Sequence, residues 1–199
     1  FLVSMLLLAS CGGGGDDPGP IVFVGDSITA LWNYPNEFPP GQTLTELVPN
    51  SIAIGYAGQT SVEIATHFSA AVLSLNPSAV VIEAGTNDLI QLPPDGITPT
   101  TDAISTMAEE AAAQGARVLI ANIPATSIPQ DNVTAAAVTA FNQQLRTLCS
   151  ASGYTYLNYQ AVLQLPDGAQ NPADFGPDGI HPNPAGFKAM LAVLEAAGI

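Results

Sequence analysis

Short apolar runs rich in β-branched residues recur along the chain, and most of them do not alternate with polar residues. Such runs are typical of strands that are buried on both faces of a sheet. We expect five strands, at residues 21–24, 52–54, 79–82, 118–121 and 154–157.

Helical periodicity occupies the stretches between these runs. We expect helices at residues 60–74, 101–114, 133–151 and 184–197. The first of them opens with the pattern of a capping box, in which Thr60 and Glu63 would satisfy free N–H groups of the first turn. Strands that alternate with helices pair in parallel through right-handed crossovers. The pattern therefore predicts one α/β domain over residues 20–199, with a five-stranded parallel sheet between two helical layers.

The composition excludes several classes of protein. A hydrophobic content of 47% in 199 residues is enough for a core. Three Lys and Arg against 17 Asp and Glu give a net charge of −14, which would repel a nucleic acid. Two His and two Cys are too few for a zinc ribbon or a disulfide scaffold, although carboxylates could still form a metal site. The absence of a dinucleotide or Walker A fingerprint argues against a nucleotide site. We expect no cofactor, and we assign no residue to a metal.

Residues 1–10 form an apolar run that is much shorter than the roughly 20 residues a membrane-spanning helix needs. We interpret this run as part of a signal peptide whose start is missing. The sequence Leu8-Ala9-Ser10-Cys11 resembles the lipobox of bacterial lipoproteins, in which the Cys carries the lipid and becomes the mature N-terminus. Residues 11–19 would then be the lipidated Cys and a flexible tether. The alternative is an ordinary secretory signal with an incidental Cys11.

The lipobox resemblance implies a location in the bacterial cell envelope, with the membrane contacted through lipidated Cys11. Gly12 rather than Asp follows the Cys, a pattern that resembles sorting to the outer membrane in a two-membrane bacterium. The second cysteine, Cys149, lies within a periodic apolar stretch, and we expect a buried thiol there.

Candidate chemistry follows the predicted strands, where ligands of such sheets bind. Gly25-Asp26-Ser27 follows the first strand, and an exposed serine at the start of a helix has N–H groups around its oxygen. Taken alone, an Asp or Ser there is more often a helix cap. Gly58 follows the second strand and Gly85-Thr86-Asn87-Asp88 the third.

A fourth block, Asp178-Gly179-Ile180-His181, precedes the last predicted helix. The spacing lets one short turn hold the carboxylate of Asp178 against the imidazole of His181, which would fix its tautomer and stabilise the imidazolium. We interpret Asp26 and Asp88 as cap or turn carboxylates, and His67 as a solvated helix residue. His181 is then the candidate base.

Together the four blocks resemble the SGNH hydrolases, also called the GDSL esterase family, over residues 21–190. The resemblance implies a flavodoxin-like sheet with Ser27 as nucleophile, His181 as base and Asp178 as the acid that orients it. It also implies an oxyanion hole made by the N–H groups of Ser27 and Gly58 and the side chain of Asn87. Ile28 stands where the family name has Leu, and Ala53 where many members have Asn. The α/β-hydrolase elbow Gly-x-Ser-x-Gly is absent.

We therefore expect a serine esterase that hydrolyses short-chain acyl esters through an acyl-enzyme. Carbohydrate O-acetyl groups are the first choice of substrate. Alternatives are a broad-range arylesterase, thioesterase or lysophospholipase, and a lipid-anchored binding or structural envelope protein without catalysis. Scarce Lys and Arg argue against substrates such as acyl-CoA.

The substrate walls should come from the loops at residues 31–40, 89–100, 124–132 and 165–176. These loops contain five apolar side chains that could line a pocket or simply pack onto the domain: Trp32, Tyr34, Phe38, Leu92 and Phe175.

Overall fold

A computed structural model describes residues 18–34, 41–91, 97–126 and 134–199. In this part of the chain, five strands form one parallel sheet in the order β2-β1-β3-β4-β5. The strands are β1 (Ile21–Gly25), β2 (Ser51–Gly55), β3 (Ala79–Glu83), β4 (Arg117–Ala121) and β5 (Thr155–Leu157). The predicted three-layer α/β/α fold is confirmed.

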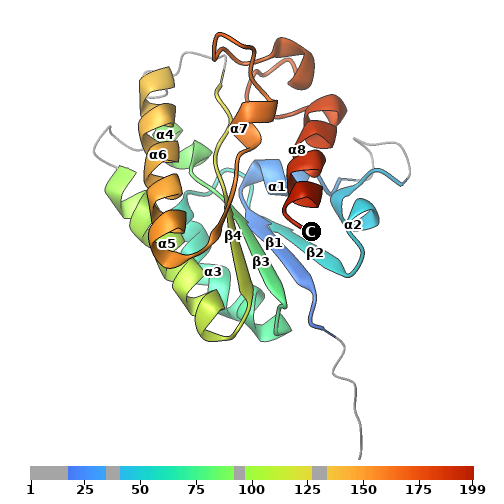
Figure 1. Ribbon diagram of the computed structural model, residues 1–199, viewed down its shortest axis with the longest axis vertical. Coiled ribbons are helices and arrows are strands. Elements are labelled where there is room, and N and C mark those ends of the chain that lie inside the picture. Colours follow the sequence, from blue (N-terminus) through green and yellow to red (C-terminus); the bar gives the residue numbers. More distant parts are fainter. Residues whose placement is uncertain (1–17, 35–40, 92–96, 127–133) are drawn as a thin grey trace, which may run out of the picture.

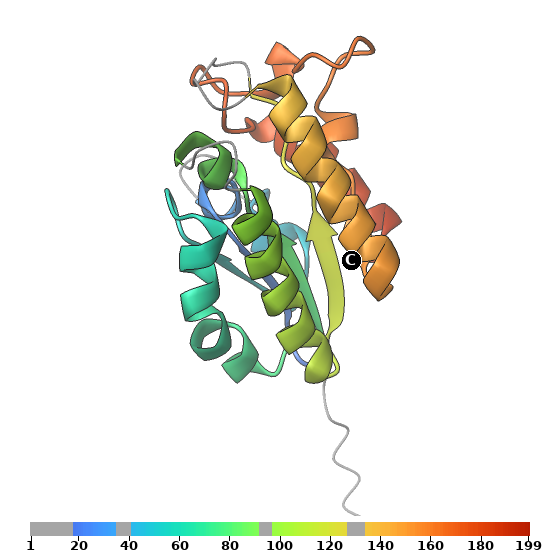
Figure 2. The ribbon, with the colours of Figure 1, turned by 90° about the vertical axis from the view of Figure 1, so that its left-hand side faces the viewer.

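Helices cover both faces of the sheet (Figures 1 and 2). One face carries α3 (Ser61–Ala71), α5 (Ile97–Ala113) and α6 (Ala135–Ser152). The other carries α1 (Ser27–Leu31), α2 (Leu44–Leu47), α7 (Tyr159–Val162) and α8 (Pro184–Ala196). The remaining elements are η1 (Leu73–Leu75), α4 (Thr86–Gln91) and η3 (Pro172–Asp174).

Both faces of the central strands are buried, which explains why the strand sequences lack polar alternation. In β1, Val22 and Val24 pack into the core under α3, α5 and α6, whereas Phe23 packs into the core under α8. All three side chains are at most 3% exposed. A strand enclosed in this way is apolar at every position.

The observed elements differ from the predicted ones mainly at their ends. The capping box of Thr60 and Glu63 is present at the start of α3. The helix predicted over residues 60–74 ends at Ala71 and continues as the tighter turn η1, which Asn76 closes in the left-handed conformation at φ 49°. Helix α5 begins at Ile97, four residues earlier than predicted, because a proline in the first turn of a helix is tolerated. Sequence analysis missed the short helices α2, α4 and α7.

No helix in the described ranges has both the length and the apolar character needed to cross a bilayer. The predicted signal segment, Cys11 and the first part of the tether lie outside the described residues.

Two carboxyl groups are enclosed where β1 and β3 end side by side. Glu83 pairs in register with Gly25, and Asp26 is the residue after Gly25. Glu83 is 3% exposed and Asp26 is 0% exposed. One oxygen of Asp26 accepts the N–H of Ile28 at 2.9 Å. Burial raises the pKa of Asp26 to about 7. Burial, with repulsion from Asp26, also raises the pKa of Glu83 well above its usual value.

This enclosure predicts that the fold loses stability as the pH rises. Above about pH 4 the unfolded chain releases the protons of both carboxyl groups, whereas the folded protein retains that of Asp26 up to about pH 7 and also holds that of Glu83 beyond its usual range. The free energy of unfolding therefore falls with increasing pH. Glu83→Gln removes one of these protonation equilibria. We expect the variant to be more stable than the wild type at pH 8 by about 1–3 kcal/mol, and to have a shallower pH dependence in urea unfolding. Glu110→Gln, at an exposed position of α5, is the control. Identical pH dependence in the wild type and Glu83→Gln would contradict the prediction.

Candidate active site

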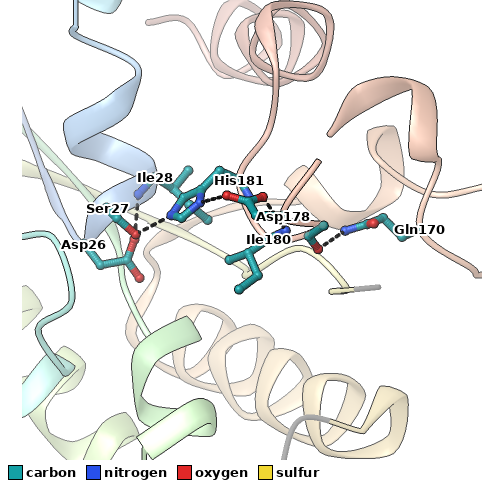
Figure 3. A network of polar contacts seen from close by, with 8 residues as sticks. Asp26, Ser27, Ile28, Gln170, Asp178, Ile180 and His181 are labelled. Atoms are coloured by element: carbon teal, nitrogen blue, oxygen red, sulfur yellow. Dashed lines mark hydrogen bonds and ion pairs between the residues drawn. The ribbon is translucent and has the colours of Figure 1, made fainter. Parts of the chain in front are cut away.

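Ser27 meets the side chains of a turn about 150 residues further along the chain, beyond the carboxyl end of β1 (Figure 3). Ser27 is the first residue of α1, and its Oγ lies 2.8 Å from Nε2 of His181. The other ring nitrogen of His181, Nδ1, lies 2.6 Å from Oδ2 of Asp178. The structure thus brings together the three residues that the sequence predicted as a catalytic set.

The position of Ser27 depends on a very tight passage from β1 into α1. A Cβ atom on Gly25 would lie 2.1 Å from the carbonyl oxygen of Glu83 and 2.4 Å from Oγ1 of Thr29, so only glycine fits. The next residue, Asp26, caps α1 through its bond to the N–H of Ile28, as expected from the sequence. Ser27 therefore starts the helix with its N–H outside the intrahelical bonding pattern.

A turn of four residues orients His181. Oδ1 of Asp178 accepts the backbone N–H groups of Ile180 at 2.9 Å and of His181 at 3.0 Å, while Oδ2 contacts the imidazole. Gly179 adopts φ 65° within this turn, a conformation that favours glycine. Partial burial opposes ionisation, but the bonds from His181 and Ile180 outweigh it and hold the pKa of Asp178 below its usual value. An ionised Asp178 favours a proton on Nδ1, which leaves Nε2 able to accept one from Ser27.

Two amide side chains attach this turn to the domain. Gln170 lies beside the Asp178–His181 turn (Figure 3), and its Nε2 donates to the carbonyl oxygen of Gly179 at 2.9 Å. The same Nε2 donates to the carbonyl oxygen of Ala125 at 2.7 Å. Asn183 caps α8 and donates to the carbonyl of Phe175 at 3.1 Å. Sequence analysis did not identify Gln170, because its partners are set by the tertiary fold and no local pattern marks it.

The loops after β2 and β3 are joined by side-chain hydrogen bonds. Nδ2 of Asn87 donates to the carbonyl of Gln59 at 3.0 Å, and Nε2 of Gln91 donates to that of Gly58 at 2.7 Å. Gly58 has φ 79°, in the left-handed region. An amide NH₂ group carries two hydrogens, so the bond to Gln59 orients Asn87 while the second hydrogen can donate to another group.

The remaining candidate residues have structural positions. Asp88 is 1% exposed and accepts the N–H of Ser61 at 2.8 Å, the Oγ of Ser61 at 2.7 Å and the Oγ1 of Thr100 at 2.9 Å. His67 is exposed and stacks on Tyr56 with the ring centroids 5.1 Å apart. Cys149 is buried, which raises the pKa of its thiol to about 11 and keeps it protonated at neutral pH. Asp88, His67 and Cys149 thus have the positions expected of residues outside the chemistry.

A hollow of about 320 Å³ adjoins the imidazole, and Leu31, Pro177 and Phe187 form part of its wall. Leu31 lies four residues after Ser27, on the same side of α1. The hollow therefore offers an apolar surface next to the Ser27–His181 pair.

The apolar loop residues have different positions. Trp32 and Phe175 are 3% and 6% exposed and pack onto the domain, Trp32 against the ring of Phe187 at 5.0 Å. Tyr34 is 52% exposed, and Phe38 and Leu92 lie outside the described residues. The described ranges contain no group of three or more His, Cys, Asp or Glu side chains that could hold a metal ion.

Several solved structures resemble this arrangement. A GDSL-like lipase from Bacteroides thetaiotaomicron VPI-5482 is 29% identical, with 90% of this chain and 87% of that chain covered and a TM-score of 0.74. A candidate acylhydrolase from Bacteroides fragilis NCTC 9343 is 26% identical, with coverage of 90% and 89% and a TM-score of 0.73.

An acetyl-xylooligosaccharide esterase from Geobacillus stearothermophilus shares the fold at 16% identity, with coverage of 89% and 93% and a TM-score of 0.71. Among curated proteins, no sequence matches the chain.

The model of the GDSL-like Lipase/Acylhydrolase family matches residues 23–189, which include the end of β1, Ser27 and the Asp178–His181 turn. The chain therefore belongs to the GDSL-like lipase/acylhydrolase family of ester hydrolases.

Proposed function

We propose that this protein is a serine esterase in which Ser27, His181 and Asp178 form the catalytic triad. The observation that carries the proposal is the continuous chain of contacts from Ser27 Oγ to His181 Nε2 at 2.8 Å and from His181 Nδ1 to Asp178 Oδ2 at 2.6 Å. A nucleophile, a base and an orienting acid in this order are what ester hydrolysis through a serine requires.

The first half-reaction forms an acyl-enzyme. His181 takes the proton of Ser27 as Oγ attacks the ester carbonyl carbon, and Asp178 stabilises the resulting imidazolium. The tetrahedral intermediate then collapses, the C–O bond to the alcohol breaks, and His181 donates its proton to the departing oxygen. Water repeats these steps on the acyl-Ser27 ester, which releases the carboxylic acid and restores the serine.

Negative charge on the tetrahedral intermediate needs donors that are already in place. The N–H groups of Ser27 and Gly58 and the second Nδ2 hydrogen of Asn87 are the donors we assign to this role. The bonds from Asn87 to Gln59 and from Gln91 to Gly58 support this assignment, because they hold the two loops in a fixed relation.

The substrate we propose is a short-chain acyl ester, in particular an O-acetyl group on a carbohydrate. The leaving alcohol must lie near Nε2 of His181 to receive its proton, and the hollow beside His181 provides space for it. The Geobacillus protein with this fold is an acetyl-xylooligosaccharide esterase, which agrees with an acetylated sugar as substrate. The alternative is a broad-range arylesterase, thioesterase or lysophospholipase. Comparison of acetate, butyrate and octanoate esters distinguishes it from an acetylesterase.

We also propose that the enzyme is held in the bacterial cell envelope by a lipid on Cys11, with a tether leading to the catalytic domain. The lipobox-like Leu8-Ala9-Ser10-Cys11 supports this location.

Ser27→Ala tests the nucleophile. Without Oγ no acyl-enzyme can form, so we expect hydrolysis of 4-nitrophenyl acetate to fall by about 10³-fold or more. Parallel assays with the butyrate and octanoate esters measure the acyl preference, and we expect the highest kcat/KM for acetate. Ser69→Ala, at an exposed position of α3, is the matched control. Unchanged hydrolysis in Ser27→Ala would contradict the assignment, whereas activity that rises toward octanoate would favour the lipid or thioester alternative.

Asn87→Ala tests the oxyanion hole. Loss of one preorganised donor should lower kcat by about 10²–10³-fold with little change in KM. Gln91→Ala removes the neighbouring hydrogen bond, from Gln91 to the carbonyl of Gly58, but it removes no proposed oxyanion donor. This variant should retain most of the activity. Equal losses of kcat in the two variants would instead assign Asn87 a structural role.

Cys11→Ser tests the anchor in a bacterium that expresses the complete precursor. We expect the wild-type protein to incorporate an alkynyl palmitate label and to sediment with membranes, and the variant to lose both properties. Cys149→Ser controls for labelling of a thiol elsewhere in the chain. An unlabelled wild-type protein that is secreted would favour the ordinary signal peptide.

A further inference from the structure

A second hollow, with a volume of about 240 Å³, lies where β4 and β5 end. Its lining consists of amide side chains together with Arg146, Tyr156 and Thr139. The six amides are Asn122, Asn142, Gln143, Asn158, Gln160 and Gln164. We call this hollow the amide pocket. It opens at the same edge of the sheet as Ser27, since both follow the carboxyl ends of parallel strands.

The floor of the amide pocket is rigid. Asn122 is fully buried, accepts the N–H of Gln160 at 2.9 Å and donates to Oδ1 of Asn158 at 2.8 Å. Asn142 is 4% exposed, exchanges hydrogen bonds with both backbone groups of Ile123, and donates to Oε1 of Gln160 at 3.0 Å. These bonds engage the oxygens of Asn158 and Gln160. The two residues therefore offer their NH₂ groups to a ligand.

Arg146 places a positive charge in the lining of the amide pocket. The guanidinium carbon of Arg146 lies 4.7 Å from the centre of the Tyr156 ring, a cation–π contact that restrains the Arg146 side chain. Arg146 is one of only three basic residues in a chain of net charge −14. It adds a planar set of N–H donors to those of the amides.

The chemistry of the lining selects the class of ligand. Amide and guanidinium groups pair with hydroxyl groups, whereas an acyl chain would leave buried polar groups without partners. The lining contains no carboxylate for a metal ion. The net charge disfavours a polyanion. A neutral polyhydroxylated ring satisfies these conditions, and the pocket is smaller than the roughly 300–1,000 Å³ of sites for drug-sized ligands.

The amide pocket is connected to the Asp178–His181 turn. Gln164 in its wall pairs with Gln170 across a short antiparallel bridge. The side chain of Gln170 holds the carbonyls of Gly179, in the Asp178–His181 turn, and of Ala125, three residues after Asn122. A ligand in the amide pocket thus contacts the same layer of loops that positions His181.

We propose that the amide pocket is a subsite for a neutral sugar unit of a glycan, separate from the unit whose acetyl ester reacts at Ser27. This inference rests on the proposed function, because a polymeric acetylated substrate gives the second subsite its purpose. The pocket would lower KM for such substrates and have no effect on small esters.

The test measures binding without turnover. Unacetylated xylohexaose, cellohexaose and mannohexaose are titrated into Ser27→Ala by calorimetry, and into Ser27→Ala that also carries Gln143→Ala or Arg146→Ala. We expect saturable binding of at least one of these sugars, and a Kd that rises at least fivefold in both pocket variants. Gln144→Ala is the matched control. Gln144 follows Gln143 on α6, but its side chain accepts a hydrogen bond from Thr101 and does not line the amide pocket.

A kinetic assay with proteins that retain Ser27 complements the titration. Gln143→Ala should raise KM for acetylated xylohexaose and leave kcat/KM for 4-nitrophenyl acetate unchanged. Failure of all three sugars to bind, or binding that neither pocket variant weakens, overturns the subsite. If the titration fails in this way while hydrolysis still requires Ser27, the subsite is overturned and the proposed function is not. Hydrolysis that survives Ser27→Ala overturns the proposed function, whereas the titration still decides whether the pocket binds sugar.

Discussion

The pairing of β1 with β2 on one side and β3 on the other is the constraint on which the site depends. Because the three strands run in parallel and in register, they end at one edge, with Gly25 beside both Gly55 and Glu83. The segments that follow them carry Ser27 at the start of α1, Gly58 in a loop and Asn87 in α4. One sheet edge thereby brings together the proposed nucleophile and two candidate oxyanion donors that are far apart in the sequence.

This arrangement requires a crowded and partly polar core at the end of β1. No side chain larger than hydrogen fits at Gly25, and the carboxyl groups of Asp26 and Glu83 are enclosed next to it. Burial without an ionic partner costs stability, which proteins tolerate where function demands it. At Asp26 the gain is a capped α1, and therefore a fixed start for the helix that presents Ser27.

The two other members of the proposed triad come from a different kind of element. Asp178 and His181 share one short turn whose geometry is largely local, since Asp178 accepts both backbone N–H groups and contacts the ring. What places this turn over Ser27 is tertiary: Gln170 holds it to the segment after β4, and Asn183 begins α8 beneath it. Gln170 also joins the Asp178–His181 turn to the amide pocket, so the position of His181 and the proposed glycan subsite depend on the same side chain.

The sequence by itself determined the strands, the longer helices and the candidate chemistry. Short apolar runs identified all five strands. In β1, β3 and β4 these runs lack alternation because burial on both faces constrains nearly every position, whereas the edge strands β2 and β5 are less buried. Gly25 before Ser27, the spacing of Asp178 and His181, and the order of the four blocks that resemble a known family indicated the candidate site, because tight turns restrict residue type. Only the tertiary structure decided how distant groups combine. Gln170, the amide pocket and the enclosure of Glu83 depend on contacts between segments up to tens of residues apart, which leave no periodic signal. The same holds for Trp32 and Phe175, since an aromatic residue in a loop has the same local sequence whether it lines a pocket or packs onto the domain.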